Sequence, residues 1–293
     1  VISLFACAII AFIYIRYTTP VYSVSSTILI RDDNNTQLGA ENILEGMELF
    51  SGKTNINNEI VVLKSFSLID KVVNELALGT SYFQHGFLQS NELYQNTPFV
   101  VKVDSNYQQI VNNEFRIKII DDNTYNLSCS IDDLNTYNLS TDRLNKNIIA
   151  NIEIDDNFLF GQQIKTKFFS FKLVKTKAFD LNAILENDKD FSFKLHQRSK
   201  LVSNYIEAVA INPINKETSV LKLKINGENP RKSIDFLNKL GEKYIDYGLN
   251  DKNNMAINTI SFIDEQLTIV KDSLLVIENS LEQFKRKHPN IEN

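Results

Sequence analysis

The feature that most constrains this chain is a regular repeat of apolar residues close to its carboxyl end. Between residues 260 and 284 these residues are spaced alternately three and four apart, which is the pattern of a coiled-coil helix over roughly four heptads. An apolar seam of that length is not stable in water, so the helix requires a partner, either a returning helix or a second subunit. The seam consists of Ile260, Ile263, Leu267, Val270, Leu274, Ile277, Leu281 and Phe284.

A second, sparser apolar stripe runs along the same predicted helix. Phe262, Ile269 and Val276 recur every seven residues, about 130° around the helix from the centre of the seam. One hypothesis is that the seam packs against a returning helix of the same chain, while this stripe is an oligomer face that contacts a neighbouring protomer. The alternative is one broad apolar face in a monomeric bundle, and the sequence does not separate the two.

Proline and glycine set the extent of this helix. The 293 residues include only 9 glycines and 5 prolines, so long uninterrupted elements are expected. Asn229 is a suitable N-cap and Pro230 suits the first helical position, and no further proline occurs before Pro289. We therefore predict a long coiled-coil helix within residues 230–293, with any bend between residues 241 and 254.

The amino terminus has the composition of a membrane segment. Residues 1–15 are apolar except for Ser3, and Arg16 and Pro20 follow. As a helix, fifteen residues span about 22 Å, which is less than the roughly 30 Å of a bilayer core. We therefore expect a transmembrane helix over residues 1–19 that is truncated at its start. A cleavable signal peptide and a buried core helix are the alternatives, although the small residues of the run lie in its middle rather than at its end.

Strand and helix patterns alternate after the apolar start. Residues 22–31 have the alternation of a half-buried strand, and a stripe of apolar residues predicts one helix from residue 59 to 78. The polar residues 32–56 are expected to form a loop with one short helix at 43–50. Later in the chain, residues 207–211 and 219–225 are predicted to form a hairpin, whose inward side chains are Leu221, Leu223 and Ile225.

Residues 98–197 are predicted to be rich in β-strand. Apolar and polar residues alternate there with the period of two that a half-buried strand requires. Turn-forming Asp and Asn residues separate the alternating segments. The clearest segments are Phe99–Val103, Phe115–Ile119, Phe169–Leu173 and Phe191–Leu195.

Composition and motifs exclude several classes of function. The net charge of -5 and the lack of a dense basic run argue against nucleic acid as a partner. The two cysteines, Cys7 and Cys129, are too few for a disulfide scaffold or a cysteine zinc site. The sequence has no glycine-rich phosphate loop, no nucleophile elbow and no paired histidines. We therefore identify no catalytic, cofactor-binding or metal-binding residue in this chain.

Isolated polar residues leave weaker hypotheses. His85, His196 and His288 are far apart in the sequence, and we expect surface or packing roles for them. The Asp-Asp pairs at 121–122 and 132–133 suggest a calcium site or turns between strands, and turns are favoured because the EF-hand spacing is missing. Glycoside hydrolysis by paired carboxylates stays open, since no separation between carboxylates is encoded in a sequence.

Several segments of the chain resemble a known family. The most specific part is residues 219–287, and the order of membrane helix, strand, helix, β-rich insert, hairpin and coiled coil covers nearly the whole chain. The chain therefore resembles the bacterial polysaccharide co-polymerases, which are the chain length determinant (Wzz-type) proteins and the membrane tyrosine autokinases (Wzc-type) of capsule and exopolysaccharide export. The segments that carry the resemblance are Glu59–Ser65, Glu228–Asn238, Phe262–Leu267 and Leu281–Lys285.

The resemblance implies an α+β fold class. Residues 20–97 and 198–229 would form the two halves of a membrane-proximal, mixed α/β base domain in the periplasm, and residues 98–197 would be its β-rich insert. Residues 230–293 would form a long coiled-coil helix that projects from this domain, as one arm of a hairpin that is truncated here.

The resemblance also implies a function and partners. Family members form ring-like homo-oligomers at the bacterial inner membrane, where they regulate the chain length and export of capsular polysaccharide, exopolysaccharide or O-antigen. A polysaccharide polymerase and an outer-membrane export protein would be partners. The large β-rich insert resembles the autokinase branch, in which a cytoplasmic tyrosine kinase that uses ATP and Mg follows a second membrane helix. No cofactor is expected in this fragment itself.

A different class of protein shares part of this organisation. The periplasmic adaptor (membrane-fusion) subunits of secretion systems also combine an amino-terminal membrane helix, β domains and a coiled coil. Adaptors nest their helical hairpin between lipoyl-like halves, whereas here the coil comes last. The adaptor is therefore the alternative function, and a bare extracytoplasmic sensor domain agrees less well with the length of the coil.

Overall fold

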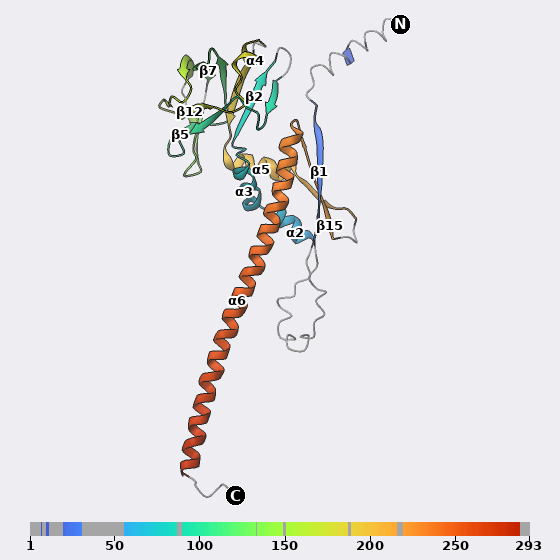
Figure 1. Ribbon diagram of the computed structural model, residues 1–293, viewed down its shortest axis with the longest axis vertical. Coiled ribbons are helices and arrows are strands. Elements are labelled where there is room, and N and C mark those ends of the chain that lie inside the picture. The colour runs from blue at the N-terminus through green and yellow to red at the C-terminus, as the bar shows by residue number, and fades with distance from the viewer. Residues whose placement is uncertain are drawn as a thin grey trace. The chain divides into compact units, whose positions relative to one another are not determined.

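A computed structural model of the chain shows two compact units, residues 1–241 and 242–293 (Figure 1). Within the described residues, the strands belong to the first unit, and one long helix, α6, continues from the first unit into the second. The predicted mixture of helices and strands with a long carboxyl-terminal helix is confirmed. The residues that the structure describes are 20–30, 56–86, 90–132, 134–148, 151–186, 189–215 and 219–287, with Cys7, Ile10 and Ala11.

The predicted membrane helix over residues 1–19 lies almost entirely outside the described residues. Cys7, Ile10 and Ala11 are helical and exposed, and they are too few to test the prediction. Among the residues that the structure describes, no helix has both the length and the apolar character needed to span a bilayer. The short helix predicted at residues 43–50 also lies outside the described part of the chain.

A small antiparallel sheet joins the two ends of the first unit. Its order is β1-β15-β14, with bounds Tyr22–Leu29, Val220–Gly227 and Ala210–Pro213. The register pairs Tyr22 with Gly227 and Leu29 with Val220. The predicted strand after residue 22 is confirmed, and so are the inward positions in β15, because Leu221, Leu223 and Ile225 are at most 4% exposed.

The first arm of the predicted hairpin begins later than expected. Residues 207 and 208 are the last residues of helix α5 (Arg198–Ala208), and the strand begins only at Ala210. The prediction of a strand from the apolar alternation of Glu207–Ile211 is therefore wrong for residues 207 and 208. The helix continues to Ala208, and the extended backbone begins at its C-cap, Val209.

The single helix predicted from residue 59 to 78 is also wrong, since two helices occupy this stretch. α2 (Ile56–Leu63) ends before Ser65, and α3 (Phe66–Glu75) begins after it. The Ser65 hydroxyl accepts a hydrogen bond from the backbone N–H of Leu68 at 3.3 Å, which is an N-cap in the middle of the apolar stripe. The stripe residues Leu63, Leu68 and Val72 are buried on both sides of the break, so the stripe is continuous although the helix is not.

Three antiparallel sheets make up the β-rich part. The largest has the order β10-β7-β6-β13-β2-β3, and its first four strands are Ile152–Leu159, Thr124–Ile131, Glu114–Ile119 and Asp190–Leu195. β2 (Thr80–His85) and β3 (Ser90–Leu93) precede residue 98, where the β-rich insert was predicted to begin, yet they pair into the same sheet.

Two three-stranded sheets accompany the large one. Their orders are β11-β12-β4 and β5-β8-β9. Strand β4 coincides with the first alternating segment recognised in the sequence, and β12 overlaps the third but begins one residue later and ends two residues later. In the first of these sheets the strands are β11 (Ile164–Lys165), β12 (Ser170–Lys175) and β4 (Phe99–Val103). In the second they are β5 (Gln108–Ile110), β8 (Leu134–Asn138) and β9 (Arg143–Ile148). The short helix α4 is Leu181–Glu186.

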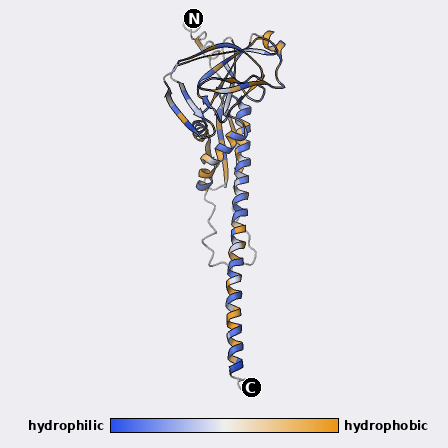
Figure 2. Cartoon of the chain, turned by 90° about the vertical axis from the view of Figure 1, so that its left-hand side faces the viewer, coloured by the Kyte–Doolittle hydropathy of each residue, from blue (hydrophilic) through white to orange (hydrophobic). Residues whose placement is uncertain are grey.

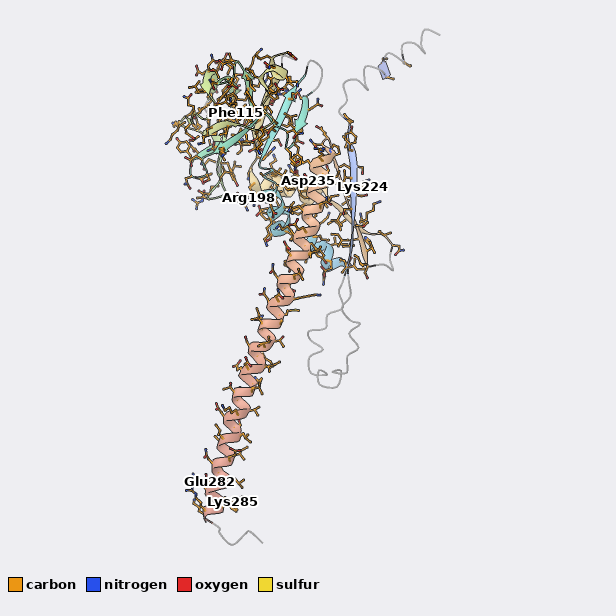
Figure 3. All side chains as sticks on the ribbon, in the orientation of Figure 1. Phe115, Arg198, Lys224, Asp235, Glu282 and Lys285 are labelled. Carbon is orange, nitrogen blue, oxygen red and sulfur yellow. The ribbon has the colours of Figure 1, made fainter. Side chains whose placement is uncertain are left out.

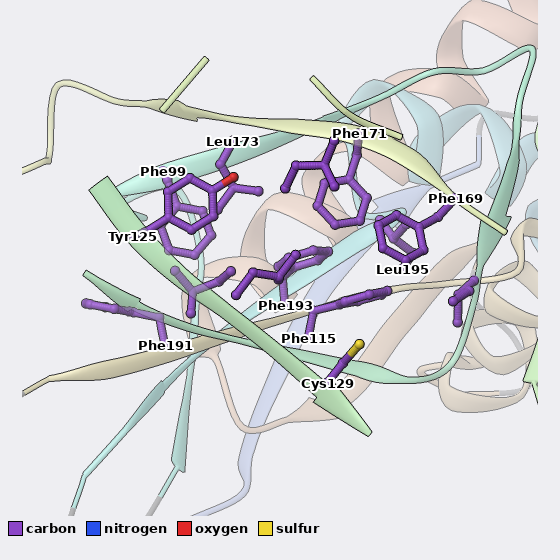
Figure 4. Close-up of a cluster of buried hydrophobic side chains, with 14 of the residues drawn as sticks. Phe99, Phe115, Tyr125, Cys129, Phe169, Phe171, Leu173, Phe191, Phe193 and Leu195 are labelled. Carbon is purple, nitrogen blue, oxygen red and sulfur yellow. The ribbon is translucent and has the colours of Figure 1, made fainter. Parts of the chain in front are cut away.

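Aromatic side chains from these strands form the main core (Figure 4). Phe115 stacks on Phe193 with ring centroids 5.0 Å apart, and its ring makes edge contacts with Phe169 and Phe171 at 5.3 and 5.4 Å. All four rings are fully buried. The core therefore results from the inward positions of β6, β12 and β13, together with the residue just before β12.

The long helix α6 (Pro230–Lys287) has 58 residues and begins where the sequence predicted. The Asn229 side chain accepts a hydrogen bond from the backbone N–H of Lys232 at 3.1 Å, so the predicted N-cap is confirmed. The helix is unbroken through residues 241–254, where a bend was expected. Its buried residues are Ser233, Phe236, Leu237 and Leu240, all in the first three turns or so.

Candidate functional site

The predicted seam and stripe lie on the part of α6 that belongs to the second unit. The eight seam side chains are between 49% and 64% exposed, and Phe262, Ile269 and Val276 are between 52% and 65% exposed. Figure 2 shows apolar residues interspersed with hydrophilic ones along this part of the helix. The structure thus places both sets on one exposed helix, and their roles as packing seam and oligomer face stay predictions.

Polar side chains on this part of α6 bond to the helix itself. The hydroxyls of Thr268, Ser273 and Ser280 each donate to the carbonyl four residues earlier, at 2.8–2.9 Å. Near the end of the helix, where Figure 3 labels Glu282, Arg286 pairs with Glu282 at 2.7 Å, one turn away. These contacts support the helix locally, so the exposed apolar residues remain its distinguishing surface feature.

The first turns of α6 carry the best-defined polar cluster in the chain. The Lys232 ammonium lies 2.6 Å from the Glu92 carboxylate on β3, and both side chains are less than a fifth exposed. The Asn229 side chain donates to the Glu92 carbonyl at 3.2 Å, and Gln95 donates to Asp235 at 2.8 Å. Figure 3 labels Asp235 at this end of the helix. The beginning of α6 is therefore bonded directly to the β-rich part.

A chain of hydrogen bonds continues from this ion pair to a buried histidine. The Ser81 hydroxyl donates to Glu92 at 3.0 Å, and His196 Nε2 lies 2.9 Å from the Ser81 oxygen. Because Ser81 has already used its only hydrogen, His196 must donate its Nε2–H. Burial, together with the charges of Lys232 and Lys194, lowers the pKa of His196 to about 4. His196 is thus a neutral donor at neutral pH.

Tyr205 on α5 completes the cluster. Its ring stacks on Phe236 of α6, with centroids 4.4 Å apart, and burial raises the pKa of its hydroxyl. Burial alone would lower the pKa of Lys232, but the neighbouring Tyr205 and Glu92 outweigh it, so the pKa is raised and the ammonium stays charged. A small cavity of about 170 Å³ opens beside Tyr205, Asn229 and Lys232.

The cluster has the character of a structural joint rather than a catalytic centre. Every polar group in it pairs with another member, and no group is positioned as a nucleophile with its own base. Sequence reasoning missed it, because Glu92 and Lys232 are 140 residues apart and neither lies in a motif. His196 was recognised only as an isolated residue, and the expected packing role agrees with its burial.

The remaining candidate residues have ordinary roles where the structure describes them. His85 bridges Ser90 and Ser192, each at 2.7 Å. The Asp121 side chain accepts hydrogen bonds from the backbone N–H groups of Asn123 and Thr124, which confirms the predicted turn at 121–122. Asp133 and His288 lie outside the described residues.

One of the two cysteines lies in the core, and the described residues contain no metal cluster. Cys129 is buried in the aromatic core, and burial raises the pKa of its thiol to about 11, so it is unreactive near neutral pH. No group of three potential metal ligands occurs among the described residues.

Comparison with known proteins addresses the first quarter of the chain. Residues 1–76 match the sequence profile of the family described as chain length determinant protein, Wzz. The predicted resemblance is confirmed. The matched segment includes β1, α2 and α3, and β1 is the strand that pairs with β15 immediately before α6. The match therefore covers part of the sheet from which the long helix begins.

The curated relatives that match this chain are named as tyrosine-protein kinases, which is the second branch of the family that the sequence resembles. The tyrosine-protein kinase wzc of Salmonella typhi is 25% identical over 105 residues, which are 36% of this chain. The corresponding protein of Salmonella typhimurium is 24% identical over 105 residues, and the AmsA protein of Erwinia amylovora is 29% identical over 96 residues, or 33% of this chain. The matched stretch spans only 13–15% of the length of these relatives.

Proposed function

We propose that this chain is part of a polysaccharide co-polymerase, which regulates the length and export of a capsular polysaccharide, exopolysaccharide or O-antigen. The observation that carries the proposal is the match of residues 1–76 to the chain length determinant family. The named kinases among the relatives favour the autokinase branch. The periplasmic adaptor gains no support from these matches.

The fold supports the same proposal. The matched segment is joined to the long helix through the β1–β15 pairing, and α6 presents eight exposed seam residues that require a covering partner. In this proposal the chain lies outside the cytoplasm at the bacterial inner membrane and assembles as a ring-like homo-oligomer. A polysaccharide polymerase and an outer-membrane export protein are the proposed partners.

A deletion in the source bacterium tests the function. The full reading frame is removed, and the surface polysaccharide is separated by size on a polyacrylamide gel. We expect the size distribution to lose its regulated length or the polymer to disappear from the surface, and the wild-type gene supplied on a plasmid should restore it. An unchanged distribution in the deletion strain would refute the proposal.

The oligomer face needs a separate test on the full-length protein. Phe262→Glu with Ile269→Glu places two charges on the proposed contact, and we expect the mass from light scattering to fall toward that of a monomer without loss of helicity. The matched control, Ser261→Glu with Thr268→Glu, adds the same charges with the same spacing on another side of the helix. Equal masses for the two double variants would exclude this face.

A further inference from the structure

The outer face of the six-stranded sheet differs sharply from its inner face. Along β6, residues 115, 117 and 119 are buried in the aromatic core, while the alternate side chains point away from it. The register places alternate side chains of β7, β10 and β13 on the same side of the sheet. These outward side chains are almost all polar, and all but Ser192 on β13 are at least partly exposed. They are Glu114, Arg116 and Lys118 on β6, Asn126, Ser128 and Ser130 on β7, Glu153, Asp155 and Asn157 on β10, and Asp190, Ser192 and Lys194 on β13.

The strand register arranges these side chains in rows across the sheet. Asp155 lies opposite Ser128, Ser128 opposite Arg116, and Arg116 opposite Ser192. Neighbouring strands are about 4.8 Å apart, so the row offers a carboxylate, a hydroxyl and a guanidinium at regular intervals on β10, β7 and β6. It ends at Ser192 on β13, whose side chain is fully buried.

Two hollows lie along this face. The first has a volume of about 510 Å³, and Glu114, Ser130 and Glu153 are among its lining residues. The second has a volume of about 500 Å³, and its lining includes His85 and Asn126. Arg116, Ser128 and Asp155 line both hollows, so the two form one trough. Each volume falls within the range of pockets that hold small organic ligands.

Hydrogen bonds hold several of these side chains in place. The Asn126 amide donates to Asp155 at 2.8 Å and to Asn157 at 3.2 Å. At the other side of the trough His85 contacts Ser192 at 2.7 Å and Glu114 at 3.0 Å. A ligand would therefore meet side chains whose orientations are already fixed, which reduces the entropic cost of binding.

Arg116 is the exception at the centre of the trough. Within the described residues its guanidinium has neither an ion-pair nor a hydrogen-bond partner, although it has five N–H donors. Acidic side chains lie on both sides of it, but none pairs with it. The acidic side chains can accept hydrogen bonds and the guanidinium of Arg116 can donate them. This combination is suited to a ligand with many hydroxyl groups, since each hydroxyl both donates and accepts.

The chemistry of the face disfavours other classes of partner. Protein interfaces have apolar and aromatic cores, whereas the only exposed large apolar residues on these four strands and their adjoining ends are Ile120 and Leu159, at one end of the face, within the described residues. Nucleic acids and anionic membranes require an excess of positive charge, but the face carries four acidic residues, Glu114, Glu153, Asp155 and Asp190, against three basic ones.

We propose that this trough binds a short oligosaccharide stretch of the polymer. Arg116 would donate to sugar hydroxyls, and Asp155 and Glu153 would accept from them. This identification of the ligand as a saccharide rests on the proposed function, while the site itself rests on the sheet face.

The test uses the full-length protein in detergent and oligosaccharides released by partial acid hydrolysis from the surface polysaccharide of the source bacterium. Isothermal titration calorimetry compares wild type with Arg116→Ala, which removes the central donors, and with Ser128→Trp, which fills the trough. The matched control is Arg143→Ala, which removes an exposed arginine from another sheet. Circular dichroism checks that each variant is folded.

We expect wild type and Arg143→Ala to bind equally, and Arg116→Ala and Ser128→Trp to bind at least about tenfold more weakly, because charge-assisted hydrogen bonds are lost or blocked. Absence of wild-type binding at millimolar oligosaccharide, or equal binding by all variants, would overturn the site. The gel of polysaccharide length from the deletion strain is independent of this titration, so failure of the site and failure of the proposed function give different results.

Discussion

The aromatic core and the distal part of α6 contain similar apolar residues but bury them to opposite extents. Phe115 is fully buried between strands, whereas Phe262 on α6 is 57% exposed. The strands of the core bring side chains from distant parts of the sequence onto facing layers, so each ring meets others. A lone helix displays its apolar residues along its own surface and needs a second layer to cover them. Apolar content therefore identifies a core only where the chain also supplies that second layer.

The largest effect should come from the same substitution made in both regions. Phe115→Ala removes a ring that contacts three others and leaves a cavity, so we expect a loss of about 3–5 kcal/mol in the free energy of unfolding. In a monomeric chain Phe262→Ala should change that free energy by less than about 0.5 kcal/mol, because its ring is exposed there. Urea denaturation followed by circular dichroism measures both. Similar losses in the free energy of unfolding for the two variants would show that the aromatic core and the distal part of α6 do not differ in this way.

The second prediction concerns the joint between α6 and the β-rich part. Glu92→Gln removes the charge that compensates Lys232 in a place where both are largely buried, and we expect a loss of about 2–4 kcal/mol. Adding Lys232→Met should recover part of this loss, since no uncompensated charge then remains. The control is Glu114→Gln at a more exposed pair, where the expected loss is below about 1 kcal/mol. A double variant no more stable than Glu92→Gln would contradict the ion-pair explanation.

The third prediction uses pH. Because the pKa of His196 is about 4 in the folded chain and about 6.5 when unfolded, the unfolded state takes up the proton first as the pH falls. Stability due to neutral His196 is complete above pH 6.5 and is lost between pH 6.5 and 4, by up to about 3 kcal/mol. Urea midpoints at pH 7.5 and 4.5 should therefore differ more for wild type than for His196→Gln. Equal differences would show that His196 does not cause the pH dependence.

The smallest effect should have the opposite sign. The Tyr125 hydroxyl is buried in the aromatic core without a hydrogen-bond partner among the described residues. Tyr125→Phe should therefore raise the free energy of unfolding by about 1 kcal/mol. The matched control is Tyr137→Phe, because the Tyr137 hydroxyl donates to Asp142 and its removal should destabilise the chain. If both substitutions destabilise equally, Tyr125 has a partner in solution.

Elements with a strong local signal could be predicted from the sequence. The start of α6 was predicted because Asn229 and Pro230 act within a single turn, and the inward side of β15 was predicted because alternation is a property of neighbouring residues. The break between α2 and α3 was missed although Ser65 is a good N-cap, since the apolar stripe continues across it. In Glu207–Ile211 the alternation began before the strand did.

The site depends on contacts that are remote in the sequence. The Glu92–Lys232 pair forms only when β3 joins the sheet and α6 begins beside it. The Ser81–His196 hydrogen bond forms only when β2 pairs with β13. The trough was missed for a similar reason: the outward residues of each strand look like an ordinary solvated face. Only the register shows that Arg116, Ser128 and Asp155 lie side by side.

The pairing of β1 with β15 also has a consequence for how the chain folds as it is made. Tyr22 and Gly227 lie 205 residues apart in the sequence. During synthesis β1 therefore cannot pair with β15 until almost the whole first unit has left the ribosome. Closing so long a loop is slow, and an unpaired strand is prone to aggregate. A chaperone that shields β1 during this interval would speed correct folding, and a chain that stops before residue 220 would never complete the sheet.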